Sequence, residues 1–291
     1  MSMRGFEIVR PTTIERAIEL LESGDPGVRP FSGGTAIMQM MKTGMFVPER
    51  LVSLAGLSKE HSAISVDGEG GMKIGAMATL STLERNDLVQ TCFPVLARTM
   101  KRLANVRVRN VATVGGALSH GDPHMDLPPV LAALDAIAIL RGPSGSREVP
   151  VADLYTGYYE TVLEPGELVA EVVIPPSDGA SAIYRKTTSR TADDWPMVGV
   201  AASLRLSGSR ISSARVIVSA ATAKLQRITA AEDVLTGQGP SREVFADAAR
   251  VASAHSDVID DAHGSSVYKS ALVEIEVRRG LRDAFEGETA E

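Results

Sequence analysis

The 291-residue sequence contains a single cysteine, Cys92. One cysteine excludes a disulfide framework, a cysteine-ligated zinc site and an iron–sulfur cluster held by this chain alone. It also favours a reducing compartment over an oxidising one. Aromatic residues are scarce as well, at 4% of the chain, which makes the only tryptophan, Trp195, conspicuous.

Long apolar runs and blocks of like charge are missing too. The longest apolar stretch, 127–140, is interrupted by two prolines and Asp135 and is too short to span a bilayer. The N-terminal residues MSMRGFEIVRP lack the apolar segment of a secretory signal, so we expect a cytoplasmic protein. Thirty basic and thirty-six acidic residues give a net charge of −6 without any Lys/Arg-rich block. A nucleic-acid partner is therefore not expected.

The remaining composition, 44% hydrophobic and 23% charged, is typical of a globular protein with room for two or three subdomains. A strand–helix–strand–helix–strand pattern runs to about residue 57. Hairpins and helices follow as far as the Pro175-Pro176 linker, and an antiparallel hairpin with three helices completes the chain. We therefore predict domains at 1–57, 58–176 and 177–291.

Three local patterns make predictions that depend on single residues. Thr12, with Glu15 three residues later, suggests a capping box at the start of the first helix. A helix over 36–42 should end at Gly44, where the glycine can terminate it. Helical periodicity predicts a further helical stretch over 80–89.

The first of two glycine-centred loops, PFSGGTAIM, spans Pro30–Met38 between a predicted strand and a predicted helix. Its paired glycines, Gly33-Gly34, permit positive φ and close backbone approach, and amides at a helix start can hold an anion such as a pyrophosphate. The same residues also suit a tight turn without a ligand. Neither the G-x-G-x-x-G dinucleotide fingerprint nor the G-x-x-x-x-G-K phosphate loop occurs in the chain.

The second loop, RNVATVGGALSHGDPHMDLP, spans Arg109–Pro128. Thr113 precedes Gly115-Gly116, so we expect a hydroxyl and several free backbone amides in one short loop. Asp126 lies ten residues after Gly116, directly ahead of a predicted helix. Its carboxylate could cap that helix or accept hydrogen bonds from ligand hydroxyls.

Four potential metal ligands alternate within the second loop: His120, Asp122, His124 and Asp126. On an extended strand all four would lie on one face, which is a plausible metal constellation. Pro123 argues against a regular strand, and the spacing matches no familiar zinc motif.

The third stretch, YRKTTSRTADDWPMVGVAA, places Lys186 at the end of a strand and Trp195 after an acidic turn. Considered singly, Lys186 suits a solvated edge charge and Trp195 a core or interface anchor. Together they offer a cation and an aromatic plane, which a flavin ring and its reduced anionic form could use.

These stretches, in this order and spacing, resemble the FAD-binding medium subunits of the xanthine dehydrogenase and carbon monoxide dehydrogenase family. The family's AGGTDL or AGGHSL corresponds to SGGTAI at 32–37, and its T-I-G-G-N corresponds to TVGGA at 113–117. The Asp-Leu that follows in the family is Asp126-Leu127 here. The third stretch shares the family's lysine and its later arginine, aspartate and aromatic residue, here Lys186, Arg190, Asp194 and Trp195.

The resemblance implies an α+β chain, with a two-part FAD-binding domain of the vanillyl-alcohol oxidase type and a C-terminal α+β domain of the CO dehydrogenase flavoprotein type. It implies FAD as the cofactor and assigns no catalytic residue and no metal ligand. Because the first loop contains neither His nor Cys, we expect the FAD to be bound without a covalent link. The residues implied around the diphosphate are Pro30, Phe31, Ser32, Gly33, Gly34, Thr35, Ala36 and Ile37, with Thr113, Gly115 and Gly116. Those implied at the rest of the cofactor are Asp126, Leu103, Val169, Lys186 and Trp195.

The same resemblance implies two partner chains, a small subunit with [2Fe-2S] clusters and a large subunit with the molybdenum cofactor, as a dimer of heterotrimers. This chain would then relay electrons from the clusters to an external acceptor. The single cysteine agrees with such a division of labour, because no cluster can be built here.

The chain departs from the family pattern at two places. Ala117 replaces the usual Asn, and Ala36-Ile37 replaces Asp-Leu, so side-chain hydrogen bonds are lost while the backbone cradle is kept. Two other functions stay open at this point. One is a metal-dependent hydrolase that uses the four alternating ligands, and the other is a nucleotide-binding subunit without redox function.

Overall fold

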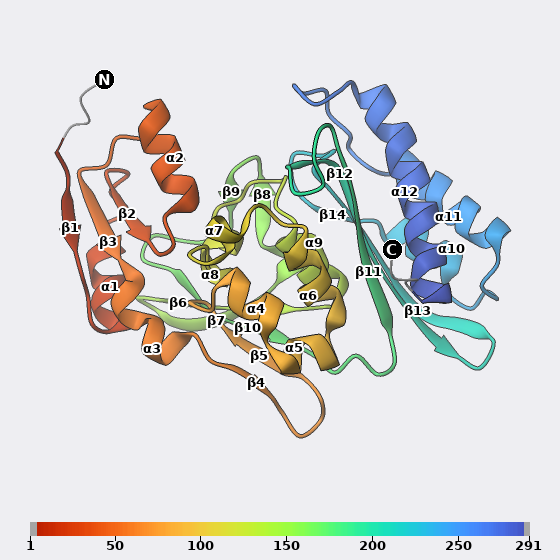
Figure 1. Cartoon of the computed structure of the whole chain (residues 1–291), viewed down its shortest axis with the longest axis horizontal. Helices are drawn as coiled ribbons and strands as arrows, with labels where there is room; N and C mark the ends of the chain where they lie inside the picture. Colours follow the sequence, from red (N-terminus) through yellow and green to blue (C-terminus); the bar gives the residue numbers. More distant parts are fainter. Residues whose placement is uncertain (1–4, 288–291) are drawn as a thin grey trace.

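The computed structural model describes residues 5–287 of the chain. Three sheets of three or more strands follow one another along the longest axis of the molecule (Figure 1). The smallest sheet lies at the N-terminal end, and the C-terminal sheet carries a layer of helices at the opposite end (Figure 1). The observed mixture of parallel and antiparallel sheets with packed helices confirms the predicted α+β class.

The N-terminal sheet is parallel, with the strand order β1-β3-β2. Helix α1 packs on it through Ile14, Ala17, Ile18 and Leu21, the apolar residues that recur at helical spacing. The elements are β1 (Glu7–Val9), α1 (Ile14–Leu21), β2 (Val28–Phe31), α2 (Thr35–Thr43) and β3 (Arg50–Ser53).

One predicted boundary in this region is wrong and another is confirmed. The cap of α1 is Thr13, whose hydroxyl accepts a hydrogen bond from the Arg16 amide at 3.2 Å, and not Thr12. The capping box fails with it, because the third helical position then belongs to Arg16 instead of Glu15. Helix α2 ends as predicted at Gly44, which adopts a left-handed φ of 75°.

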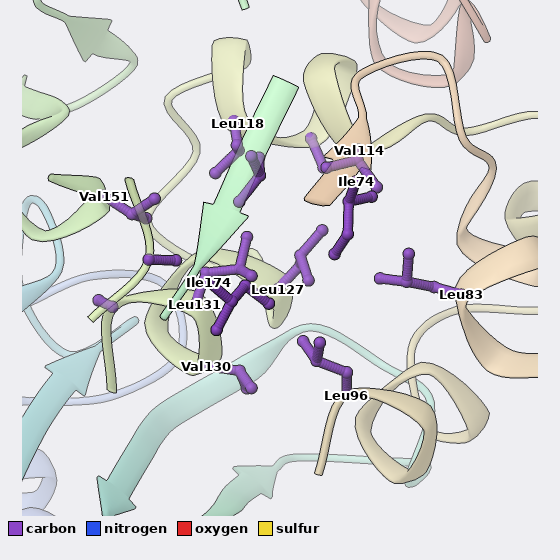
Figure 2. Packing of buried hydrophobic residues seen from close by; sticks show 14 of the residues in the cluster. Ile74, Leu83, Leu96, Val114, Leu118, Leu127, Val130, Leu131, Val151 and Ile174 are labelled. Carbon is purple, nitrogen blue, oxygen red and sulfur yellow. The ribbon is translucent and has the colours of Figure 1, made fainter. Parts of the chain in front are cut away.

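The middle of the chain forms a five-stranded antiparallel sheet with the order β4-β5-β10-β6-β7. Short helices pack against it and bury one large aliphatic core (Figure 2). The strands are β4 (Ile64–Val66), β5 (Met72–Gly75), β6 (Ile137–Gly142), β7 (Gly145–Pro150) and β10 (Leu168–Ile174), with a small hairpin of β8 (Tyr155–Gly157) and β9 (Glu160–Thr161).

The predicted helical stretch over 80–89 is two helices. Asn86 has an extended ψ of 124°, so it ends the first helix, and its side chain accepts a hydrogen bond from the Val89 amide to begin the second. The helices of the middle region are α3 (Ser58–His61), α4 (Leu80–Arg85), α5 (Asp87–Cys92), α6 (Pro94–Lys101), α7 (Val106–Arg109), α8 (Val114–Ser119) and α9 (Leu127–Ala133), with short 3-10 turns at Leu54–Leu57 and Val151–Asp153.

The C-terminal sheet is antiparallel, in the order β11-β12-β13-β14, and includes the predicted hairpin. One face packs on three helices to form its own core, and the other face contributes Tyr184, Ala201 and Ile217 to the core of the middle region. The elements are β11 (Ser181–Thr188), β12 (Pro196–Ser207), β13 (Arg210–Ser219), β14 (Gln226–Arg227), α10 (Thr229–Leu235), α11 (Arg242–Ala254) and α12 (Ser266–Glu286).

Candidate functional site

The first glycine loop joins the end of β2 to the start of α2. Gly34 is the N-cap of α2, with φ of 72°, and it has no side chain with which to cap the helix. The amides of Thr35, Ala36 and Ile37 occupy the first turn, where a helix supplies no internal acceptor. These donors and the positive end of the helix dipole form a site suited to an anion.

The two glycines of this loop are needed for different reasons. Only Gly34 adopts the left-handed backbone conformation that the sequence suggested for the pair. Gly33 instead lies against the second loop, since a β-carbon at this position would be 1.9 Å from the Val111 carbonyl oxygen and 2.8 Å from Ala112 Cα. Close contact between the two loops therefore excludes any side chain at Gly33.

The second loop touches the first through hydroxyl groups. Ser32 Oγ and Thr113 Oγ1 are 3.0 Å apart, and a β-carbon on Gly116 would lie within 3.0 Å of both oxygens. Gly115 approaches β10, because its β-carbon would be 3.4 Å from the carbonyl oxygen of Val169. The structure thus brings together the predicted residues Ser32, Gly33, Thr113, Gly115, Gly116 and Val169.

The expectation of several free amides in the second loop is wrong. The Val114 and Gly115 amides donate to Ala78 O at 2.9 Å and Ala76 O at 2.8 Å. Thr113 caps α8 by accepting from the Gly116 amide at 3.2 Å. These amides serve the packing of α8 against the segment after β5, so the open backbone donors of the site belong to the first loop.

Asp126 begins α9 but does not cap it with its side chain. Its carboxylate accepts hydrogen bonds from Tyr184 Oη at 2.7 Å and from Lys186 Nζ at 3.0 Å. Burial raises the pKa of Asp126, while Lys186 and Tyr184 oppose that rise. Burial, together with the charge of Asp126, also holds the pKa of Tyr184 well above its ordinary value. Asp126 therefore anchors a buried polar network instead of a helix start.

Lys186 is buried and not a solvated edge charge, since its side chain is only 2% exposed. Besides Asp126, its ammonium group donates to Arg102 O at 2.8 Å and to Asp194 O at 3.1 Å. All three ammonium donors are thus used within the protein. The bond to Arg102 O places the network beside Leu103, which is buried in the core of the middle region.

Sequence reasoning missed Tyr184, although a signal for it existed. Tyr184 and Lys186 are two residues apart on β11, and side chains at that spacing share one face of a strand. Because both side chains reach Asp126, the face of β11 that carries Lys186 could have been searched for a second donor.

Trp195 does not lie in the core, since it is 54% exposed. Its indole stacks on the imidazole of His124, with ring centroids 6.0 Å apart and planes inclined by 19°. The bond from Lys186 to the neighbouring carbonyl of Asp194 ties its loop to the buried network. The predicted residues thus form two groups, one at the glycine loops and one around Asp126, joined by α8 and residues 120–126.

The four alternating ligands do not converge on a metal position. Gly121, with φ of 71°, and the following Pro123 break the strand that would have aligned them. His124 turns to Asp122, with Nδ1 and Oδ1 3.1 Å apart, whereas Asp126 turns away to Lys186. Within residues 5–287, no group of three or more His, Cys, Asp or Glu side chains is placed to hold a metal ion. The strand that would have given the four side chains a shared face is therefore not formed, as Pro123 indicated.

Comparison with known proteins decides the family. Residues 4–177 match the FAD binding domain in molybdopterin dehydrogenase, and residues 182–284 match the CO dehydrogenase flavoprotein C-terminal domain. The chain belongs to this flavoprotein family. The family resemblance and the order of the two domains, both expected from the motifs, are confirmed.

Medium chains of two dehydrogenases resemble the chain over nearly its whole length. The carbon monoxide dehydrogenase medium chain of Hydrogenophaga pseudoflava is 31% identical over 287 residues, which cover 96% of this chain and 97% of that one. The glyceraldehyde dehydrogenase medium chain of Sulfolobus acidocaldarius is 29% identical, with 96% and 98% covered. A solved structure of carbon monoxide dehydrogenase from Hydrogenophaga pseudoflava superposes with a TM-score of 0.93 at 32% identity, covering 98% of this chain and 99% of that one.

Proposed function

We propose that this chain is the FAD-carrying subunit of a molybdenum hydroxylase and relays electrons from [2Fe-2S] clusters to an external acceptor. The observation that carries the proposal is the match of both family domains over nearly the whole chain, shared with relatives that are named as medium chains of dehydrogenases. Substrate oxidation belongs to a large molybdenum subunit and the clusters to a small subunit, in a dimer of heterotrimers. A cytoplasmic location is supported by the single cysteine.

The open end of α2 fits the diphosphate of FAD. The first-turn amides supply donors, Gly34 leaves the helix end uncovered, and residues 30–37 are nearly all partly exposed. The hydroxyls of Ser32 and Thr113 lie beside these amides at the loop contact, where Gly115 and Gly116 keep side chains away. Bound FAD supplies the redox chemistry, and the protein supplies its orientation and electrostatic environment.

The Asp126 network fits the polar middle of the cofactor. A carboxylate offers about four lone-pair positions, and the hydrogen bonds of Asp126 to Tyr184 and Lys186 use one on each oxygen. Capacity remains for a ligand hydroxyl. Lys186 acts through its charge and by fixing Asp126, while Leu103, Val169 and Trp195 would border the flavin ring.

The alternative functions lack such support. A metal-dependent hydrolase needs converging ligands, and Asp126 is turned away from Asp122 and His124 into the Lys186 network. A nucleotide-binding subunit without redox function would share the cradle, but the relatives that align over nearly the whole chain are named as subunits of dehydrogenases and hydroxylases.

FAD is expected to be bound without a covalent link. The loop Pro30–Ile37 contains neither His nor Cys, the side chains that commonly attach a flavin. Acid precipitation of the yellow protein should therefore release the colour into the supernatant, where its absorption spectrum can be compared with free FAD. Colour that stays in the protein pellet after washing would contradict non-covalent binding.

The isolated chain should reduce no flavin when a substrate is added. It should gain that ability when co-produced with the small and large subunits, because the oxidising centre and the clusters lie on those chains. The measurement is flavin bleaching under anaerobic conditions with N-heterocycles, aldehydes and carbon monoxide as candidate substrates. Iron and molybdenum content and the particle mass of the complex test the heterotrimer. Substrate-dependent bleaching by the lone, metal-free chain would overturn the relay function.

A further inference from the structure

His124 lies where three parts of the chain meet. Its ring has neighbours in the β8–β9 turn and in the segment before α12: Tyr158 at 6.5 Å and His263 at 5.2 Å between ring centroids. Trp195, from the loop between β11 and β12, stacks on it. The side chain is 5% exposed, so the imidazole is a buried platform beneath an exposed indole.

One edge of the His124 ring is firmly attached. Nδ1 is hydrogen-bonded to Asp122 Oδ1 at 3.1 Å, and the same oxygen accepts from the His124 amide at 2.9 Å. Asp122 Oδ2 accepts in turn from Tyr159 Oη at 3.2 Å. Burial alone would raise the pKa of Asp122, but these bonds from His124 lower it, so the carboxylate stays charged and holds the ring.

Within residues 5–287, the other edge of the ring makes no hydrogen bond. His124 Nε2 is buried without a hydrogen-bond partner in this part of the chain and lies 3.8 Å from Asp261 Oδ2, an oxygen that accepts from the buried Lys269 at 2.9 Å. An unsatisfied buried nitrogen is unfavourable. A ring that is fixed at one edge and unpaired at the other can still interact through its flat face. Trp195 covers that face in a nearly parallel orientation.

The indole itself has few other restraints. The Trp195 amide bonds to its neighbour Asp194 Oδ1 at 2.9 Å, and Lys186 holds the Asp194 carbonyl, but both contacts fix the backbone and not the ring. With one face on His124 and 54% of the residue exposed, the indole keeps accessible surface that a second planar group could cover.

We infer that His124 is a positioning residue, whose Asp122-fixed imidazole holds the Trp195 indole with its accessible surface toward the flavin. The stack is a property of this chain alone. Only its effect on the flavin rests on the proposed function.

The stack can be tested in the full-length chain without FAD, because Trp195 is the only tryptophan and its fluorescence reports on this site alone. His124→Asn keeps a donor for Asp122 but removes the ring, so the indole should gain mobility and quencher access. Aromatic pairing of about 0.5–1.5 kcal/mol raises the ratio of stacked to unstacked indole about two- to tenfold. His124→Asn should lose this factor. Emission anisotropy should fall, and the acrylamide quenching constant should rise.

Two further variants separate the ring from its surroundings. His124→Phe keeps a flat face but loses the bond to Asp122, so its anisotropy should fall between those of the parent and of His124→Asn. His263→Asn removes the imidazole beside His124 but keeps the ring on which Trp195 stacks, so it should leave the indole unchanged. Thermal melting of each variant identifies any general loss of structure. If His124→Asn does not fold, His124→Phe tests the inference by itself: its anisotropy should fall below that of the parent, and a parental value would show that the bond to Asp122 does not hold the indole.

The flavin is examined separately in the assembled complex. There, His124→Asn should shift the flavin midpoint potential, and His124→Phe should restore it toward the parent value. A complex that binds no FAD would overturn the proposed function and leave the stack intact. A folded His124→Asn chain with parental anisotropy and quenching would overturn the stack and leave FAD binding intact. An unshifted potential in a variant with a released indole would limit His124 to supporting the loop and overturn its role toward the flavin.

Discussion

Gly33→Ala is expected to retain little FAD and to unfold at a lower urea concentration than the parent chain. The added methyl group would lie 1.9 Å from the Val111 carbonyl oxygen and 2.6 Å from its carbon, both of which are backbone atoms. Neither can rotate away, so the two glycine loops must separate. Overpacking of this kind lowers the free energy of unfolding by about 1–3 kcal/mol. Separation of the loops also breaks the Ser32–Thr113 contact beside the open end of α2.

A graded series distinguishes this effect from a general sensitivity to substitution. Gly68→Ala is the matched control, because a β-carbon in that exposed turn meets nothing within 4 Å and φ is not in the left-handed region. Gly115→Ala should fall between the two, since its nearest contact is the Ala76 side chain at 2.8 Å. Urea unfolding curves and the FAD content per chain give the measurements. A Gly33→Ala chain with parental stability and full FAD would show that the loops do not meet as described.

The sequence predicted features that depend on residues close together along the chain. The apolar spacing of α1, the left-handed glycine after α2 and the linker before β11 are all local, and the structure contains them. Periodicity missed the break at Asn86, because the apolar pattern continues across it while the side chain of Asn86 caps the next helix. The cap of α1 was misplaced by one residue because Thr12 and Thr13 carry the same hydroxyl group, and either could cap a helix.

Features that depend on pairing between distant segments could not be read from the sequence. The amides of the second loop looked free because their acceptors, Ala76 O and Ala78 O, lie more than thirty residues earlier. Pro123 already indicated that the four alternating ligands do not share a face, but the sequence did not reveal that β11 would bring Lys186 and Tyr184 to Asp126. The site residues were predicted through the motifs, whereas their hydrogen-bond partners were not.

Lys186→Met is expected to have the largest effect on stability among the charged residues of the site. The variant removes the ammonium group that neutralises Asp126 while both side chains are almost fully buried, at 2% and 6% exposure. Breaking such a pair by removing one partner costs about 3–5 kcal/mol, because it leaves an uncompensated buried charge. The backbone bonds to Arg102 O and Asp194 O are lost as well, so the Trp195 loop should also loosen.

The defect should depend on pH in a defined direction. Burial already raises the pKa of Asp126 above its ordinary value, and loss of Lys186 removes the main opposing charge. A group whose folded pKa is raised favours folding most below its unfolded pKa, and that contribution disappears as the pH rises through the folded pKa. Lys186→Met should therefore differ least from the parent near pH 4, where Asp126 can take up a proton, and most at neutral pH.

A second substitution decides whether the uncompensated charge is the cause. Lys186→Met combined with Asp126→Asn buries no charge, so it should recover much of the lost stability and abolish the added pH dependence. It should not restore FAD retention, because the proposed hydrogen bond to the cofactor requires the Asp126 carboxylate. Arg16→Met, in an ion pair with Glu19 whose side chains are 59% and 60% exposed, is the control and should change stability by about 0–1 kcal/mol. Urea unfolding of the four chains between pH 4 and pH 8 provides the test. Equal, pH-independent losses in the single and double variants would show that packing, and not charge, makes Lys186 necessary.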